Sequence, residues 1–203
     1  MTGGTASGKS ALGALLRRRG AAVYSVDEAA HDLYRPGRPA HRRIVRVFGM
    51  RVLARDGAVS RQALGARVFS DSAAMRRLEG IVHPLLRRES AAAVRRMRKR
   101  HALTVVEAGP LLFELKLDRL ADMVVVTRCR AAVRRDRLRR RGLAAREAAM
   151  RVGAAAALED SLPRRARETG RELLVDNDGD PVRLEKAADV IVARAKECAS
   201  ALT

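Results

Sequence analysis

The feature that most constrains the fold of this chain is an eight-residue segment close to its first residue. Gly3 is followed by four residues and then by Gly8-Lys9-Ser10, which gives the pattern G-x-x-x-x-G-K-S. Glycines let the backbone approach phosphate oxygens closely, and the N-terminus of a following helix favours anions. The pattern predicts a phosphate-binding loop for ATP, in which Lys9 contacts the β- and γ-phosphates and Ser10 supplies a hydroxyl group to Mg²⁺.

A phosphate-binding loop lies between a β-strand and a helix, and this sequence predicts only the helix. Leu12, Leu15 and Leu16 share one face of the helix expected from Lys9 to Arg19, which favours the loop over a chance match in a Gly-rich, basic chain. Such a loop follows a β-strand, yet only Met1-Thr2 precede it, so we expect the first strand to be missing and apolar residues to be encoded upstream. The residues expected to contact the nucleotide are Gly3, Gly4, Thr5, Ala6, Ser7, Gly8, Lys9, Ser10 and Ala11.

Short apolar runs alternate with helical patterns along the rest of the chain. Between residues 39 and 101 the pattern is helical throughout, with a kink or break expected at His83-Pro84. The alternation predicts an α/β fold with a parallel sheet and a helical insertion. The runs that are expected to form strands are Ala21–Val26, Leu103–Glu107, Met123–Thr127 and Glu172–Val175.

Other motifs narrow the class of phosphate-binding protein. The chain has no Asn-Lys-x-Asp segment, which argues against a GTPase, and no apolar strand ending in Asp-Glu, which argues against the common ATPase motors. A small-molecule kinase needs a carboxylate that orients or deprotonates the acceptor hydroxyl group. Asp27, at the carboxyl end of the second predicted strand, suits that role, because this edge of an open α/β sheet faces the loop. The alternative is that Asp27 only caps a helix that starts at Glu28.

Composition gives weaker constraints. The formal net charge is +19, yet only five of the 42 basic residues are Lys. The charge favours an anionic partner, while Arg-rich and Ala-rich usage also fits a GC-rich genome, and both interpretations stay open. Only 2% of the residues are aromatic, so base stacking has little support and no nucleic acid is expected as a partner. The chain has no long apolar run, which predicts a cytoplasmic protein without a membrane segment.

Several segments, in this order along the chain, resemble the dephospho-CoA kinase family. They cover most of the sequence, and their ordered combination is more specific than the phosphate loop alone. The matching segments are Thr2–Ser10, Val23–Asp27, Pro36-Gly37, Asp56–Arg61 with Leu64 and Val68-Phe69, Leu78-Glu79, His83-Pro84, Pro110–Glu114 and Val175–Gly179.

The resemblance implies a P-loop nucleotide-kinase-like fold, a three-layer sandwich with a helical CoA-binding insertion and a helical lid. The implied core is 1–30, 102–127 and 170–203, the substrate subdomain is 31–101 and the lid is 128–169. The implied reaction is ATP-dependent phosphorylation of the ribose 3′-hydroxyl group of dephospho-CoA, the last step of coenzyme A biosynthesis. Asp27 corresponds to the general base of the family and Arg140 approximately to its lid arginine. The implied assembly is a monomer or a weak homo-oligomer.

The chain departs from the family pattern at three places. Ser25 replaces the first Asp of an Asp-x-Asp pair, Ala6 replaces a loop glycine, and the segment Arg151–Ala155 lacks the Gln that often follows the lid. His83 either binds substrate or orients a bent helix, and Glu114 is structural in our interpretation. Asp176 and Asn177 are expected to form a turn on the adenine side through backbone contacts.

Three alternatives remain at the level of sequence. The first is another nucleoside or nucleotide kinase. The second is a basic nucleic-acid-binding protein with an incidental loop, which would show salt-dependent RNA binding without ATP turnover. The third is an inactive, truncated relative that lacks its first strand.

Overall fold

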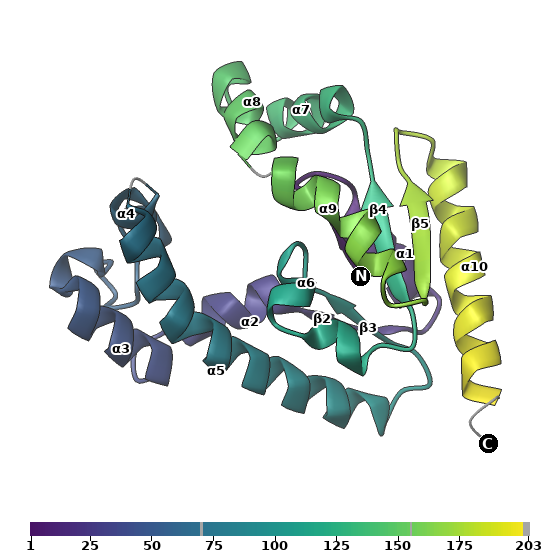
Figure 1. Cartoon of the computed structure of the whole chain (residues 1–203), viewed down its shortest axis with the longest axis horizontal. Coiled ribbons are helices and arrows are strands. Elements are labelled where there is room, and N and C mark those ends of the chain that lie inside the picture. The colour runs from purple at the N-terminus through teal and green to yellow at the C-terminus, as the bar shows by residue number, and fades with distance from the viewer. Residues whose placement is uncertain (70, 155, 201–203) are drawn as a thin grey trace. The chain divides into compact units, whose positions relative to one another are not determined.

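The computed structural model describes residues 1–69, 71–154 and 156–200 (Figure 1). The chain divides into two compact units, one formed by Met1–Ser25 with Ala93–Thr203 and the other by Val26–Ala92. Ala155, the last residue of the segment Arg151–Ala155 in which the Gln of the family is absent, lies outside the described residues. Within the described residues, no helix combines the length and apolar character that a membrane crossing needs.

The described residues of the first unit form five strands in two sheets, and the strands are parallel within each sheet. One sheet has the order β1-β4-β5, from Thr2–Gly3, Val124–Arg128 and Glu172–Asp176. The other pairs β2, Ala22–Ser25, with β3, Thr104–Glu107. The predicted strands are confirmed to within two residues at each end, because each is a run of apolar residues bounded by turns.

The first strand is not wholly missing, as the sequence suggested, but it is only two residues long. Thr2 is in register with Val126 and Gly3 with Thr127, so the strand still holds the start of the loop against β4. Met1 reaches β3 on the other side: its amino group donates to Val106 O at 2.7 Å, and Ala108 N donates to Met1 O at 3.1 Å. An apolar cavity of about 270 Å³ is lined by Met1, Val105 and Val125 among others.

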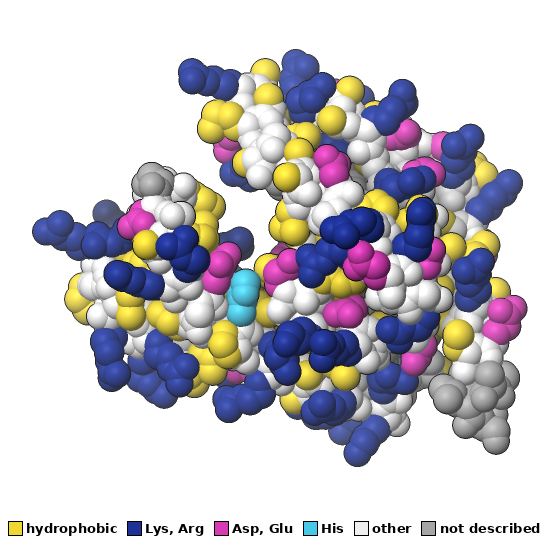
Figure 2. Space-filling model, viewed as in Figure 1, with side chains coloured by type: hydrophobic (Ala, Val, Ile, Leu, Met, Phe, Trp, Pro, Cys, Tyr) yellow, Lys and Arg dark blue, Asp and Glu magenta, His cyan; other side chains and the backbone are white. Residues whose placement is uncertain are grey.

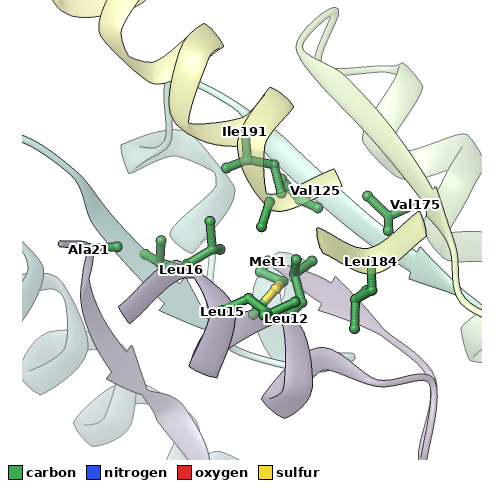
Figure 3. Packing of buried hydrophobic residues seen from close by; sticks show 11 residues of the cluster. Met1, Leu12, Leu15, Leu16, Ala21, Val125, Val175, Leu184 and Ile191 are labelled. Atoms are coloured by element: carbon green, nitrogen blue, oxygen red, sulfur yellow. The ribbon is translucent and has the colours of Figure 1, made fainter. Parts of the chain in front are cut away.

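Helices cover the strands of the first unit. In Figure 1, β4 and β5 lie between α9, Ala156–Arg167, and α10, Pro181–Ser200. The helix α1, Lys9–Arg18, packs with α10 over a core to which β3, β4 and β5 each contribute one valine (Figure 3). This arrangement is the predicted three-layer sandwich. The residues of the core are Met1, Leu12, Leu15, Leu16, Ala21, Val105, Val125, Val175, Leu184, Ala188 and Ile191.

The remaining helices of the first unit are short. They are α6, Leu111–Glu114, the 3₁₀ helix η2, Leu117–Leu120, α7, Ala131–Arg140, and α8, Ala145–Ala154. The helices α7, α8 and α9 make up most of the segment 128–169, which was expected to be helical. Leu138, Ala148 and Val152 form a small apolar cluster of their own between α7 and α8.

The second unit is helical, as the sequence predicted. It contains α2, Val26–Leu33, α3, Pro39–Phe48, the 3₁₀ helix η1, Met50–Val52, α4, Arg61–Val68, and most of α5, Ser72–Arg98. Ser60 caps α4, since its Oγ accepts a hydrogen bond from Ala63 N at 3.2 Å. Pro84 lies inside α5, and the helix continues past it. Of the expected kink or break at His83-Pro84, the break is therefore wrong, because the long helix retains enough of its other hydrogen bonds to tolerate one missing donor, while a kink stays a prediction.

The buried amino group of Met1 gives a pH prediction. Burial lowers the pKa of this amine from 8.0 to about 5, with Glu107 opposing the shift and Lys9 adding to it. Between pH 5 and 8 the unfolded chain therefore binds a proton that the folded chain does not bind. The free energy of unfolding should fall as the pH drops through this range, by up to about 4 kcal/mol for a three-unit shift.

Acetylation of Met1 isolates this contribution, because an amide does not titrate and still keeps an N–H group to donate to Val106 O. Urea melts of the acetylated and the free chain between pH 5 and 8 should give free energies of unfolding that agree near pH 8 and diverge toward pH 5. Parallel curves for the two chains would show that the amine remains charged in the folded protein.

Candidate active site

The predicted phosphate loop connects β1 to α1. It leaves the sheet at Gly3 and ends at Gly8, which has φ 102° and stands directly before the helix at Lys9. Ser7 and Thr127 hold the inner side of the loop against β4, since their hydroxyl groups are 2.6 Å apart. Both side chains are buried. The loop is therefore fixed to the sheet even though β1 contributes only two residues.

Side chains bind five successive carbonyl oxygens of the loop. Lys9 Nζ donates to Gly3 O and Gly4 O, both at 2.8 Å. The other three donors come from outside the loop: Arg134 Nε to Thr5 O at 2.8 Å, Arg137 Nη1 to Ala6 O at 3.0 Å and Asn177 Nδ2 to Ser7 O at 2.9 Å. Together these bonds fix the peptide planes of the loop, which is what phosphate binding through backbone N–H groups requires.

Two positions in the loop show why its residue types matter. A Cβ atom on Gly8 would lie 1.8 Å from Asn177 Nδ2, so only glycine allows this side chain to reach Ser7 O. Ala6 has a left-handed backbone with φ 60°, a conformation that costs a non-glycine residue about 1 kcal/mol. Its methyl group packs against the cluster of Leu138, Ala148 and Val152, and this contact offsets the strain. The departure at Ala6 thus has a structural role.

Ser10, the expected magnesium ligand, has a carboxylate beside it. Ser10 Oγ donates to Glu107 Oε1 at 2.9 Å. Glu107 is the last residue of β3 and is in register with Ser25 of β2, so it stands at the carboxyl edge of the strands. Glu107 was not among the predicted site residues, although it stands at the end of a predicted strand, as Asp27 does.

The arginines of the segment 128–169 divide into two groups. Arg134 and Arg137 contact loop carbonyl oxygens, and Arg137 also donates to Asn177 O at 2.9 Å. Arg140, the predicted phosphate contact, pairs with Asp136 at 3.0 Å and has a side chain 80% exposed. The structure therefore brings Arg134 and Arg137 to the loop, while a phosphate contact by Arg140 stays a prediction.

The other predicted residues are described by the elements that carry them. Asp27 is exposed in the second unit, inside the first turn of α2, which begins at Val26 and not at the expected Glu28. His83 is half-buried in α5, and Ala11 is exposed in α1. Glu114 pairs with Arg165 at 2.6 Å, in agreement with a structural role.

Asp176 is the last residue of β5 and Asn177 follows it, and the structure gives each a definite partner. Asp176 receives two hydrogen bonds from Arg128, at 2.8 and 2.9 Å, and Asn177 N donates to Arg128 O at 2.8 Å. A turn of these residues on the adenine side stays a prediction, and the contact of the Asn177 side chain with the loop was not expected. Reading that contact from the sequence would have required knowing that β5 ends beside the loop.

A parallel sheet between helical layers, with this loop between its first strand and first helix, defines a P-loop nucleotide-kinase fold. The family model described as dephospho-CoA kinase matches residues 1–181. The chain belongs to the dephospho-CoA kinase family, and it is an enzyme of the phosphotransferase class that uses ATP.

Individual relatives agree with this assignment. A dephospho-CoA kinase of Anaeromyxobacter dehalogenans is 43% identical over 197 residues, which cover 95% of this chain and 89% of the relative. One of Geobacter sulfurreducens is 36% identical over 195 residues and 96% of both chains. Among solved structures, a Thermus thermophilus protein has a TM-score of 0.73 at 28% identity, covering 95% of this chain and 94% of its own. A dephospho-CoA kinase of Campylobacter jejuni has a TM-score of 0.66 at 20% identity with the same coverage, and supports the fold.

Proposed function

We propose that this chain transfers the γ-phosphoryl group of ATP to the ribose 3′-hydroxyl group of dephospho-CoA, giving CoA and ADP. The observation that carries the proposal is the loop from Gly3 to Ser10, whose carbonyl oxygens are held by Lys9, Arg134, Arg137 and Asn177 in a chain of the dephospho-CoA kinase family. Phosphoryl transfer depends mainly on positioning and on electrostatic stabilisation, and a rigid loop with a lysine supplies both.

The groups around Ser10 fit a magnesium ion. Mg²⁺ prefers oxygen ligands and keeps several waters when it binds phosphates. Ser10 Oγ and Glu107 Oε1 are 2.9 Å apart, so a hydroxyl group and a carboxylate are already together at the start of α1. We propose that Ser10 is a ligand of the ion and that Glu107 holds waters of its shell. The ion would offset negative charge on the β- and γ-phosphates.

In the proposed reaction each residue has one task. Lys9 stabilises charge on the transferring phosphoryl group, and Asp27 orients the acceptor hydroxyl group and accepts its proton. Residues 31–101 would bind dephospho-CoA, and the segment 128–169 would act as a lid, with Arg140 as a phosphate contact on closure. Closing such a lid limits hydrolysis of ATP by excluding water.

A coupled assay of ADP release tests the proposed acceptor. We expect turnover with ATP, Mg²⁺ and dephospho-CoA, with CoA identified as the product by its mass, and no comparable turnover with adenosine, AMP or CMP. Turnover only with a nucleoside or nucleotide would show that the chain is a kinase for that acceptor and would contradict the proposal. An absence of turnover combined with salt-dependent RNA binding would favour the nucleic-acid interpretation. Figure 2 shows the basic side chains that motivate this interpretation, scattered among acidic and apolar ones.

A further inference from the structure

A buried ion pair contacts the phosphate loop at Thr5. Arg134 lies on α7 and Glu159 on α9, and their side chains form a salt bridge with only 10% and 3% of their surfaces exposed. Arg134 Nε also donates to Thr5 O at 2.8 Å, and Glu159 Oε1 accepts from Thr5 N at 2.7 Å. Two helices that are far from the loop in the sequence thus hold both backbone polar groups of one loop residue. We call Arg134 and Glu159 the Thr5 clamp.

The clamp needs the bare backbone of Gly4. A Cβ atom at this position would lie 2.7 Å from Glu159 Cδ and 2.9 Å from Arg134 Cζ. The side chains of the pair are therefore in direct contact with the backbone of Gly4. A glycine at position 4 is explained by this close approach.

The charges of the two residues have different consequences for a phosphate ligand. Glu159 places a negative charge against loop N–H groups, the kind of group that attracts phosphate in such loops. Arg134 neutralises that charge. Both groups are nearly excluded from water, so each would act strongly on the loop if its partner were removed.

We propose that Arg134 and Glu159 are positioning residues for ATP: they fix the Thr5 peptide, and Arg134 keeps the carboxylate from repelling the phosphates. This inference rests on the proposed function only in that ATP binds at this loop. It concerns nucleotide affinity and does not depend on which acceptor receives the phosphoryl group.

Two single variants break the same pair with opposite residual charge. Arg134→Gln leaves an unpaired carboxylate at the loop, and we expect the Kd of Mg·ATP to rise about tenfold or more. Glu159→Gln keeps an oxygen that accepts from Thr5 N and leaves a positive charge, so the Kd should change by less than about threefold. Both variants should lose similar thermal stability. The double variant Arg134→Gln with Glu159→Gln leaves no charge, and its Kd should return toward that of the wild type.

Titration calorimetry with Mg·ATP and thermal melts on the full chain give the needed comparison. Arg165→Gln is the matched control, because Arg165 is also on α9 and pairs with Glu114 outside the loop. It should lose stability and keep the wild-type Kd. The proposal is overturned if the two single variants weaken ATP binding equally, which a merely structural pair predicts, or if both keep the wild-type Kd. Normal ATP binding without phosphorylation of dephospho-CoA would instead count against the proposed acceptor alone.

Discussion

Replacing Asp27 by Asn should lower kcat by about 10²–10⁴-fold while leaving the Kd of ATP within about twofold of the wild-type value. The amide keeps the size and hydrogen-bonding reach of the carboxylate but cannot accept the proton of the acceptor hydroxyl group. Asp27 lies two residues after Ser25, which ends β2 and is in register with Glu107 of β3. Glu107 in turn accepts a hydrogen bond from the Ser10 hydroxyl group. Coupled ADP release gives kcat, and titration calorimetry gives the Kd.

Glu28→Gln is the control for this experiment. Asp27 and Glu28 are both acidic residues in the first turn of α2, where a negative charge stabilises the helix through its dipole. If Asp27 acted only in this way, the two variants would lose a few tenths of a kcal/mol of stability and would both keep their turnover. Wild-type kcat in Asp27→Asn would remove Asp27 from the proposed mechanism.

Lys9→Ala should lower kcat/KM by about 10²–10³-fold, the loss usual for removing one preorganised donor to a developing negative charge. ATP binding should weaken as well, because the ammonium group is the loop's own cation and also bonds Gly3 O and Gly4 O at 2.8 Å. The expected loss of ATP affinity therefore has two causes: the phosphates lose an attracting charge, and the loop loses the two hydrogen bonds that hold Gly3 O and Gly4 O. Steady-state kinetics with ATP varied, together with calorimetry, measure the losses of kcat/KM and of ATP affinity.

Lys186→Ala provides the comparison for Lys9, since Lys186 is exposed on α10 in the same unit. It should retain the activity and ATP affinity of the wild type. An unchanged Kd for ATP in Lys9→Ala would argue against the loop as the nucleotide site. Lys9→Arg should also lose activity, because a planar guanidinium group does not replace a compact ammonium group at a point contact.

The sequence located the centre of the site but not its surroundings. Gly3 to Ser10 could be recognised because the spacing of glycines, lysine and hydroxyl group is dictated locally by the phosphate they bind. Glu159 lies 154 residues away from Thr5 along the chain, and Asn177 lies 170 residues from Ser7. No local pattern reports such distances. A basic, helical segment offers several equivalent arginines, so the sequence alone could not single out Arg134 and Arg137 as the two that contact the loop.

The sequence by itself determined the alternation of strands and helices, the phosphate loop and the helical second unit, because hydrophobic periodicity and turn residues act over a few neighbouring positions. Only the tertiary structure decided that α5 continues through Pro84, that two residues suffice to pair the first strand with β4, and that Ala6 tolerates a left-handed backbone. The pairing of the first strand and the backbone of Ala6 depend on contacts from distant segments, whereas α5 keeps enough of its own hydrogen bonds to continue past Pro84. Packing and buried hydrogen bonds between such segments outweigh local preferences of about 1 kcal/mol.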